Sequence, residues 1–566
     1  MENMTNKNRS TRSMYEQYIN GGREIVEKNH LERKEDFRKG LSVYDLKSCE
    51  LTVGDCSKWD LHNASGVPLD YDKENRKVYI DGSDAHTLLI GSTGSKKTRL
   101  VGMPIVLALA SSSENMIICD PKGEIFKRTS GVLQDNDYNT NVINLRNPLQ
   151  GDGWNMLEIP YRKYCEGDID KACEFINDMT INLMPIQARD PYWDYSARDV
   201  LFGLILLLFK LGVELALPNG SVSMKSVLRL RRELFRSSDS QLIQNTKLWE
   251  FAKRDELIHA RLYGTVICPE KTMACIISTF DQHMSCFSLQ PQMIDMLSNS
   301  TFDVNRFGFE KRALYLIMPD EKTTYHRIIT IITKQIYELL IDNAYKLTKD
   351  NRFDTRINFV LDEFSSLPTI SDMPQMIAAS RSRNIRFHLI VQSRHQLAQR
   401  YGEETETIMS NCANWIFLTS RELGLIKDIS ELCGTVGRDR EPLVSVSRLQ
   451  HMNKQTGECL ILSGRKYPYF AFLPDIDLYD NKEYHTIELA RRTVPDDTYK
   501  GFGYYEKAVK EWLKHDEMSN SEAVQIEDNN SQELDEIRKE LEAKFDELFG
   551  PLDSDDNQPS SSSADK

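Results

Sequence analysis

A short apolar segment, His86–Ile90, runs directly into the sequence GSTGSKKT at residues 91–98. This sequence fits the phosphate-binding pattern G-x-x-x-x-G-K-[ST] except at one position, where Lys96 replaces the second glycine. Such a loop joins a buried strand to the N-terminus of a helix, because its backbone N–H groups must converge on phosphate oxygens. The segment therefore predicts an α/β fold with a parallel sheet and a nucleotide site at one sheet edge.

Further apolar segments fit strands of the same sheet. They are Asn115–Asp120, Ala313–Met318, Ile357–Leu361, Phe387–Gln392 and Trp415–Leu418, with Cys459–Leu462 and Tyr469–Leu473 as edge strands. Long helical stretches lie between them, notably His326–Leu347. From about residue 160 to 300 helical periods dominate and convincing strands disappear, which predicts an all-helical insertion into the sheet domain.

Each position of the loop has an expected task. The nucleotide-binding residues are Gly91, Ser92, Thr93, Gly94, Ser95, Lys96, Lys97 and Thr98. Lys97 is expected to reach the β- and γ-phosphates of ATP, and Thr98 to ligate Mg²⁺. A left-handed backbone at Lys96 costs about 1–2 kcal/mol of strain for a residue with a side chain, although its ammonium adds positive charge beside a triphosphate.

An acidic pair follows one of the apolar strands, in the sequence INFVLDEF. Asp362 is predicted to hold the Mg²⁺ shell, and Glu363 to polarise an attacking water as general base. An ordinary strand-to-loop boundary is the alternative interpretation of this pair. Asp120 and Lys122 end another strand beside the expected site, but they receive no catalytic role because Pro-Lys-Gly is also plain turn chemistry.

The overall charge does not indicate nucleic-acid binding. The chain of 566 residues has a net charge of −14, but residues 516–566 contain sixteen Asp/Glu and four Lys/Arg. The rest of the chain is nearly neutral, so any contact with DNA must come from local basic stripes. Eleven single cysteines without C-x-x-C spacing indicate reduced thiols rather than a zinc site or a disulfide framework.

No apolar segment is long enough to predict a membrane span or a signal peptide. The longest, Val200–Phe209, makes about 15 Å of helix, which is half a bilayer and indicates a buried core helix. The polar tail from 516 onward is predicted to be mostly disordered. Within it, residues 532–549 carry an apolar stripe that predicts a short amphipathic helix.

Several ordered motifs together resemble one known family. They are GSTGSKKT, CDPKGEIF at Cys119–Phe126, YWDYSARDVLFGLI at Tyr192–Ile205, and LDEFSSLPTISDMPQMIAASRSRNIRFHLIVQS at Leu361–Ser393. In this order they resemble the TraG/TraD-type coupling ATPases of type IV secretion, over roughly residues 85–475. The resemblance implies a RecA-like P-loop NTPase domain, α/β in class, that is interrupted by an all-alpha domain and followed by a disordered acidic C-terminal tail.

The resemblance also implies two further catalytic residues. Arg381 matches the arginine that the family is thought to project into a neighbouring subunit's nucleotide site, with Arg383 and Arg386 as competing candidates and a solvated helix end as the plain alternative. Gln392 matches a sensor of the γ-phosphate or its water, and a strand-end amide that caps a loop is its alternative.

The patterns and the resemblance predict a division of the chain. It consists of an N-terminal region without membrane helices (1–80), a RecA-like domain (81–175 and 301–490), an all-alpha insertion (176–300), a helical end segment (491–515) and the acidic tail (516–566). In the insertion Lys225, Arg229, Arg232 and Arg236 recur at helical spacing, which fits a substrate-contacting stripe or, alternatively, a solvated helix face.

The implied function is that of a coupling ATPase that delivers relaxase-bound DNA or protein to a conjugative type IV secretion channel. ATP and Mg²⁺ are the implied cofactors. The implied partners are DNA, a relaxosome or accessory protein docked on the acidic tail, channel components through a separate membrane subunit, and further copies in a homo-hexamer. The expected location is cytoplasmic, peripheral at the inner face of the bacterial cell membrane. Two alternatives stay open: a substrate receptor with impaired hydrolysis, and a related ring ATPase in DNA processing without a secretion channel.

Overall fold

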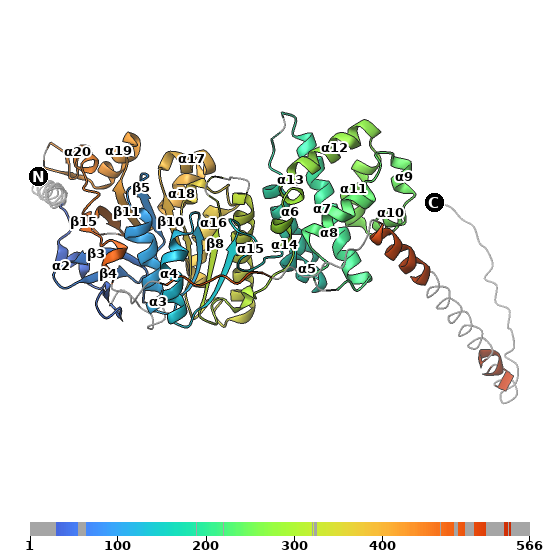
Figure 1. Ribbon diagram of the computed structural model, residues 1–566, viewed down its shortest axis with the longest axis horizontal. Helices are drawn as coiled ribbons and strands as arrows, with labels where there is room; N and C mark the ends of the chain where they lie inside the picture. Colours follow the sequence, from blue (N-terminus) through green and yellow to red (C-terminus); the bar gives the residue numbers. More distant parts are fainter. Residues whose placement is uncertain are drawn as a thin grey trace, which may run out of the picture.

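Two lobes make up the protein, one built around a sheet and one built only of helices (Figure 1). The computed structural model describes residues 30–54, 64–187, 189–218, 220–319, 321, 325–437, 439–464, 466–479, 485–492, 503–516, 537–541 and 543–544. The predicted fold class, a RecA-like α/β domain with an all-alpha insertion, is confirmed. Most of the acidic tail and of the predicted helix 532–549 lies outside the described residues.

Nine strands of the described chain form the main sheet, in the order β15-β14-β11-β5-β10-β9-β6-β8-β7. They are β5 (Thr87–Gly91), β6 (Asn115–Asp120), β7 (Asn139–Asn144), β8 (Arg312–Ile317), β9 (Ile357–Leu361), β10 (Ile385–Val391), β11 (Asn414–Thr419), β14 (Glu458–Ser463) and β15 (Tyr469–Phe472). The strands from β11 to β7 pair in parallel, and β14 and β15 are antiparallel. The phosphate-loop strand β5 therefore lies in the middle of the sheet.

Helices cover both faces of the sheet. Successive side chains of each strand point to opposite faces, and both sets of side chains are buried. Met116 and Ile118 of β6 belong to the core shared with α3 (Met103–Ser111) and α4 (Glu124–Asp135). Ile117 and Cys119 belong to the core on the other face. That face is covered by α15 (His326–Leu347), α16 (Met373–Ser380) and α17 (Arg394–Tyr401). The continuous apolar strands thus follow from burial on both faces.

The helical lobe is inserted between β7 and β8. It contains α5 (Glu158–Cys165), α6 (Ile169–Leu183), α7 (Tyr192–Glu214), α8 (Met224–Leu234), α9 (Ser240–Gln244), α10 (Lys247–Ala252), α11 (Glu256–Val266), α12 (Glu270–His283), α13 (Ser285–Ser288) and α14 (Pro291–Met296). The apolar segment Val200–Phe209 is buried in the centre of α7, as its length predicts. The helices begin at Glu158, so the expected domain boundary at residue 176 falls within α6.

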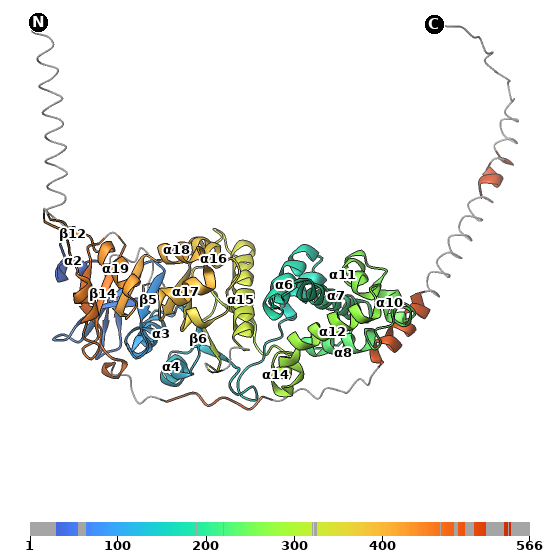
Figure 2. The same cartoon turned by 90° about the horizontal axis from the view of Figure 1, so that it is seen from above.

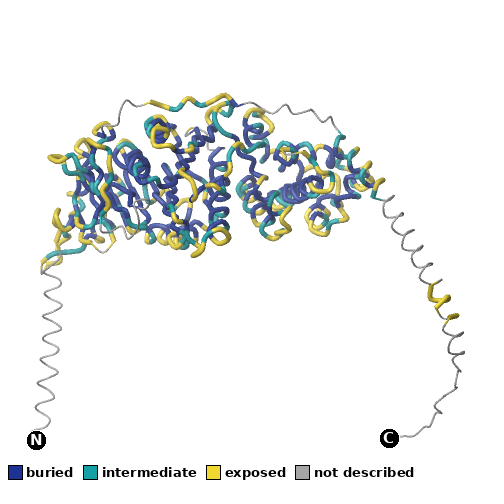
Figure 3. The backbone as a smooth tube through the Cα atoms, turned by 90° about the horizontal axis from the view of Figure 1, so that it is seen from below, coloured by how far each residue is buried: buried dark blue, intermediate teal, exposed yellow. Residues whose placement is uncertain are grey.

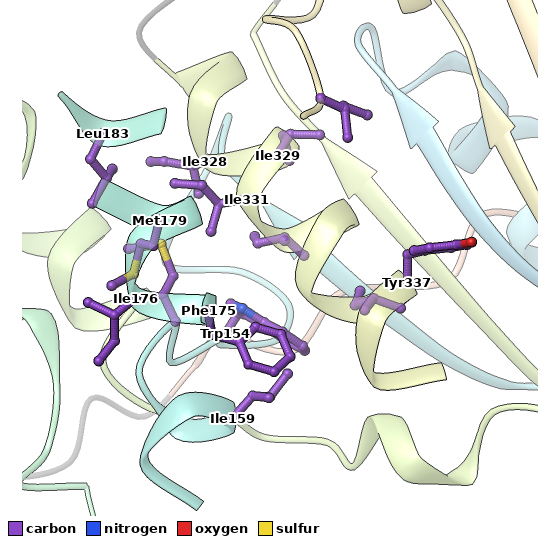
Figure 4. Packing of buried hydrophobic residues seen from close by; sticks show 14 of the residues in the cluster. Trp154, Ile159, Phe175, Ile176, Met179, Leu183, Ile328, Ile329, Ile331 and Tyr337 are labelled. Atoms are coloured by element: carbon purple, nitrogen blue, oxygen red, sulfur yellow. The ribbon is translucent and has the colours of Figure 1, made fainter. Parts of the chain in front are cut away.

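The two lobes meet where α6 packs against α15. Figure 4 shows Ile176, Met179 and Leu183 of α6 opposite Ile328 and Ile331 of α15, all of them buried. Lys334 of α15 adds an ion pair of 2.5 Å to Asp178 of α6. The helix that packs on the sheet is therefore also the helix that contacts the insertion.

The N-terminal region contains a second sheet that the sequence patterns do not predict. β1 (Ser42–Asp45), β2 (Leu51–Thr52), β3 (Val67–Asp72) and β4 (Lys77–Asp81) pair antiparallel in the order β2-β1-β4-β3. These strands are short and mix apolar with charged residues, so none of them forms a continuous apolar segment in the sequence. Their inward side chains, such as Val78 and Ile80, join the core beside α3.

After the sheet the chain runs back to the helical lobe. Residues 485–492 lie along α4 and the loop that follows β7, where the Ile487 amide donates to Ser130 Oγ at 3.2 Å and the Arg492 amide to the Leu149 carbonyl at 2.8 Å (Figure 2). A helix over residues 504–516 then packs on the insertion, with the rings of Trp512 and Phe251 5.2 Å apart. Figure 3 shows the buried residues of the two lobes, with residues 485–492 passing beside them.

Within the described part of the chain, no helix combines the length and the apolar character that a membrane span requires.

Candidate nucleotide site

The phosphate loop begins where β5 ends and leads into a helix, as the motif predicts. Lys97 is 6 % exposed, and its ammonium donates to the Gly91 carbonyl at 2.8 Å. Burial lowers the pKa of Lys97, although Glu363 and Asp362 act in the opposite direction. The side chain is thus folded back across the loop, in a position from which it can exchange a carbonyl for a phosphate oxygen.

The first turn after the loop is wider than an α-helix. Residues Thr98–Gly102 form a π-helix, η2, which continues into α3 with Pro104 in its first turn. Proline has no backbone N–H, so the ordinary bond to the carbonyl four residues earlier is absent there. Such π-helical turns are frequent at functional sites. The helix thus changes type directly beside Thr98.

Lys96 has the left-handed backbone that the missing glycine would have supplied. Its φ is 63°, and that of Gly94 is 77°. Its ammonium lies 3.4 Å from the Asp475 carboxylate, which also accepts from Arg99. The loop therefore keeps the backbone of a phosphate loop, and the Lys96 side chain is directed toward an acid on the segment after β15.

The acidic pair meets the phosphate loop across β10. The Thr98 hydroxyl donates to Asp362 Oδ2 at 3.1 Å, and the Glu363 amide donates to Asp362 Oδ1 at 2.9 Å. Asp362 is 5 % exposed, and burial, with Glu363 and Asp120 nearby, raises its pKa to about 7. A cation bound at this site would favour the charged form of Asp362, whose proton would then leave to solvent.

A chain of side-chain hydrogen bonds closes the other side of the loop. The Thr93 hydroxyl donates to Gln392 Oε1 at 3.1 Å, and Gln392 Nε2 donates to Glu363 Oε2 at 2.6 Å. Glu363 itself has a left-handed backbone with φ of 52°, which aims its side chain back at the loop. Gln392, Glu363 and Thr93 thus form one connected group at the carboxyl ends of three neighbouring strands.

Asp120 is a further member of this site, although the sequence analysis gives it no catalytic role. It ends β6, next to β9, is 1 % exposed and accepts from the Phe126 amide at 2.8 Å. Burial raises its pKa to about 6. Its signal in the sequence is its position at the end of a buried parallel strand, which brings it to the same sheet edge as Asp362.

Arg381 lies at the amino ends of the parallel strands, whereas the nucleotide site lies at their carboxyl ends. It follows α16 and precedes β10, whereas Gln392 follows β10, and the seven residues of β10 span about 20 Å at ~3.3 Å per residue. Its guanidinium pairs with Asp84 at 2.9 Å. The competing candidate Arg386 is 1 % exposed and bonded to Glu114. Arg381 is therefore remote from the nucleotide site of its own chain and accessible on the surface.

The basic residues of the insertion do not form one continuous stripe. Lys225 pairs with Asp295 at 2.9 Å. The helix α8 ends at Leu234, so Arg236 lies beyond it. Arg232 is exposed, and Arg229 is half-buried. The spacing predicts that all four residues share one helical face. This prediction is wrong for Arg236, because the helix ends two residues earlier.

A phosphate loop on a central parallel strand, faced by an acidic pair two strands away, defines the sheet lobe as a RecA-like P-loop NTPase fold. The profile of the type IV secretory system conjugative DNA transfer family matches residues 49–457. The chain belongs to this family.

Two curated relatives and two solved structures are similar to the chain. A conjugal transfer protein TraG of Escherichia coli is 25 % identical over 423 residues, which cover 71 % of this chain and 62 % of TraG. A second Escherichia coli TraG is 24 % identical over 399 residues, which cover 67 % of this chain and 59 % of that TraG. The chain therefore spans about three fifths of the length of these relatives.

The similar structures are of the bacterial coupling protein TrwB. TrwB in complex with the ATP analogue ADPNP matches with a TM-score of 0.52 at 16 % identity, covering 74 % of this chain and 91 % of TrwB. A sulphate complex of TrwB matches with a TM-score of 0.52 at 15 % identity, covering 72 % of this chain and 89 % of TrwB. This likeness establishes the fold.

Proposed function

We propose that the chain is the coupling ATPase of a conjugative type IV secretion system. It recruits relaxase-bound DNA or protein and uses ATP binding and hydrolysis to deliver this substrate to the channel. The family assignment supports the transfer role. TrwB, whose fold it shares, binds an ATP analogue, which supports the choice of nucleotide.

One observation carries the proposal: the side chains needed for hydrolysis are already connected around the loop. Thr98 contacts Asp362, and Gln392 bonds both Thr93 and Glu363. A nucleotide receptor without turnover would have no use for a glutamate and a glutamine held together beside the γ-phosphate position. Electrostatic stabilisation and positioning are the main catalytic devices of phosphoryl transfer, and this arrangement supplies both.

The residues present fit a magnesium ion. Oxygen ligands are the ones that Mg²⁺ prefers, and it keeps several waters. The Thr98 hydroxyl and the Asp362 carboxylate would hold the ion or its waters, while Asp120 adds negative charge at the same edge. The ion would supply neutralisation of the phosphate oxygens. Lys97 would bind the β- and γ-phosphates, Glu363 would take the proton of the attacking water, and Gln392 would orient that water.

The test is calorimetric titration of the full chain with ATP and Mg²⁺, followed by turnover measurements. Glu363→Gln should keep the affinity for ATP and lower turnover by roughly 10²–10⁴-fold, the usual contribution of a general base. Lys97→Ala should lose affinity. Absence of any heat or thermal protection for the unaltered chain with ATP and Mg²⁺ would refute the proposal.

A substrate receptor with impaired hydrolysis is the second candidate, favoured by the lysine at position 96. In that case turnover of the unaltered chain would equal that of Glu363→Gln. The left-handed φ of Lys96 and its contact with Asp475 argue for the motor, because the loop backbone is not displaced.

The partners follow from the same proposal. Arg381 would enter the nucleotide site of a neighbouring copy in a homo-hexamer, since it lies on the edge of the sheet opposite its own phosphate loop. The acidic tail, residues 516–566, would dock a relaxosome or accessory protein, and a separate membrane subunit would hold the ring at the inner face of the cell membrane. Deletion of 516–566 should leave ATP affinity intact and lower substrate recruitment.

A further inference from the structure

A cavity at the junction of the two lobes has no task in the nucleotide site. It has a volume of about 250 Å³ and is lined by Leu183, Gln187, Gln282, His283, Ser285, Cys286, Arg327 and Ile328. Leu183 and Ile328, which face each other in Figure 4, form its apolar floor. Its polar groups come from the loop after α6, the end of α12, α13 and the first turn of α15.

An arginine without an acidic partner faces this cavity. Arg327 is half-buried, and within the described residues no carboxylate lies at ion-pair distance from its guanidinium. Burial lowers its pKa, and the thiol of Cys286 is the group that opposes this effect. A half-buried guanidinium is retained at a cost unless an anion pairs with it. The cavity therefore has the charge of an anion site.

Neutral donors surround the arginine. In the described part of the chain the side chains of Gln187, Gln282 and Ser285 have no hydrogen-bond partner. Together with Arg327 they offer amide, hydroxyl and guanidinium N–H or O–H groups toward one space, which suits the several oxygens of a phosphate. A lone carboxylate would satisfy fewer of them.

The YWDYSARD motif builds the wall of this cavity. Asp194 is 1 % exposed, and its carboxylate bonds His283 Nε2 at 2.7 Å and accepts from the Gln187 amide at 2.8 Å. One helical turn later, Arg198 donates to the Met184 carbonyl at 2.7 Å. The motif thus fixes the loop after α6 and the end of α12 in relation to each other.

The same turn of α7 exposes two tyrosines. Tyr192 is 48 % exposed and Tyr195 is 52 % exposed, three residues apart on one helix face. Arg198 lies over the Tyr195 ring, 5.5 Å from its centroid. Exposed aromatic rings are surfaces on which successive bases of a single strand can stack, and this turn of α7 adjoins the cavity through the contact of Asp194 with His283. Neither a duplex nor an acidic peptide requires such rings.

We propose that this cavity binds a backbone phosphate of single-stranded nucleic acid, with the neighbouring bases stacked on Tyr192 and Tyr195. The proposal rests on the proposed transfer function and adds the place where the strand is held. The site is distinct from the basic residues at and beyond α8, for which the sequence leaves substrate contact and a solvated helix face both open.

The cavity is also connected to the nucleotide site. Next to Arg327, the His326 ring nitrogens lie 3.2 Å from the Ser366 carbonyl and 3.1 Å from the Pro319 carbonyl. Ser366 in turn donates its amide to the Glu363 carbonyl at 2.8 Å. A strand bound at Arg327 thus acts on the helix turn that contacts the segment carrying the general base.

The test measures the affinity of the full chain for a fluorescent single-stranded oligothymidine by anisotropy at several salt concentrations. Arg327→Gln should weaken binding about tenfold and reduce the slope of log K against log salt by about one. Tyr195→Ala should weaken binding about fivefold or more. On an abasic strand of the same length, Tyr195→Ala should no longer weaken binding, whereas Arg327→Gln should still weaken it.

The matched controls are Arg306→Gln, an exposed arginine paired with Glu310, and Tyr263→Ala, an exposed tyrosine of α11. Neither should change the affinity. If Arg327→Gln melts early, Gln282→Ala replaces it, with an expected loss of about threefold, the weight of one hydrogen bond. Oligothymidine should also stimulate ATP turnover of the unaltered chain, and this stimulation should be lost in Arg327→Gln.

Three results would overturn the proposal. The first is equal oligothymidine affinity in Arg327→Gln, Arg306→Gln and the unaltered chain. The second is absence of binding by the unaltered chain. The third is Arg327-dependent binding of polyglutamate with oligothymidine binding unchanged, which would make the cavity a protein-docking site. Failure of the proposed function is distinguishable, because it appears as a loss of ATP binding by the unaltered chain while the oligothymidine results stand.

Discussion

Asp362→Asn should stabilise the nucleotide-free protein while removing its response to ATP and Mg²⁺. Asp362 is 5 % exposed, and burial raises its pKa from 3.8 to about 7. Asparagine has the same shape, and its oxygen can still accept from the Glu363 amide. The Thr98 hydroxyl can rotate to accept from the new NH₂ group, so no buried group loses its partner.

The magnitude follows from the two pKa values. Between pH 4 and 7 the folded protein keeps a proton on Asp362 that the unfolded chain has already lost, so the free energy of unfolding falls as the pH rises through this window. A difference of about three pKa units corresponds to an upper limit of ~4 kcal/mol, reached above pH 7. Asp362→Asn removes this penalty, so the gain should be largest at pH 8 and absent near pH 4.

The assay is thermal melting of both proteins from pH 4 to 8 without nucleotide, repeated at pH 8 with ATP and Mg²⁺. The variant should melt several degrees higher at pH 8, at about 2–4 °C per kcal/mol for a domain of this size. Glu338→Gln is the matched control: burial raises the pKa of Glu338 to about 7 at the lobe junction, and that variant should keep the ATP response. A variant of Asp362 that melts at or below the unaltered protein at pH 8 would refute the reasoning.

Three further predictions concern the loop, the subunit interface and the end segment. Lys96→Gly should change ATP turnover by less than about threefold, because the backbone at φ 63° already has the shape that glycine allows; a hundredfold gain in a turnover assay would contradict this. Arg381→Ala and Lys97→Ala subunits should each lack turnover, yet a mixture should recover part of it, because an intact arginine can then face an intact site in another copy; no recovery on mixing would count against a shared site. Trp512→Ala should destabilise the helical lobe by about 1–2 kcal/mol, because its partly buried ring packs on Phe251; a lower melting temperature with unchanged ATP affinity would demonstrate this.

Local patterns in the sequence sufficed for the elements that carry the nucleotide chemistry. The strands β6 and β9 occupy the predicted residues, and the loop at residues 91–98 begins at the end of a buried strand. This is because a strand buried on both faces is a continuous apolar run, and because a phosphate loop has a fixed spacing. The N-terminal sheet was missed since its strands are short and mix polar with apolar residues, and since β1 pairs with β4 across the intervening β2 and β3.

The tertiary structure decided which further residues share a site. Asp120 joins Asp362 because β6 and β9 are neighbours in the sheet, and Arg381 is remote from Gln392 because a whole strand separates them. Arg327, His283 and Asp194 belong to three helices far apart in the sequence and meet only through the packing of the insertion on α15. Sequence periodicity reports which face of an element is buried, but strand order and helix packing determine what that face meets.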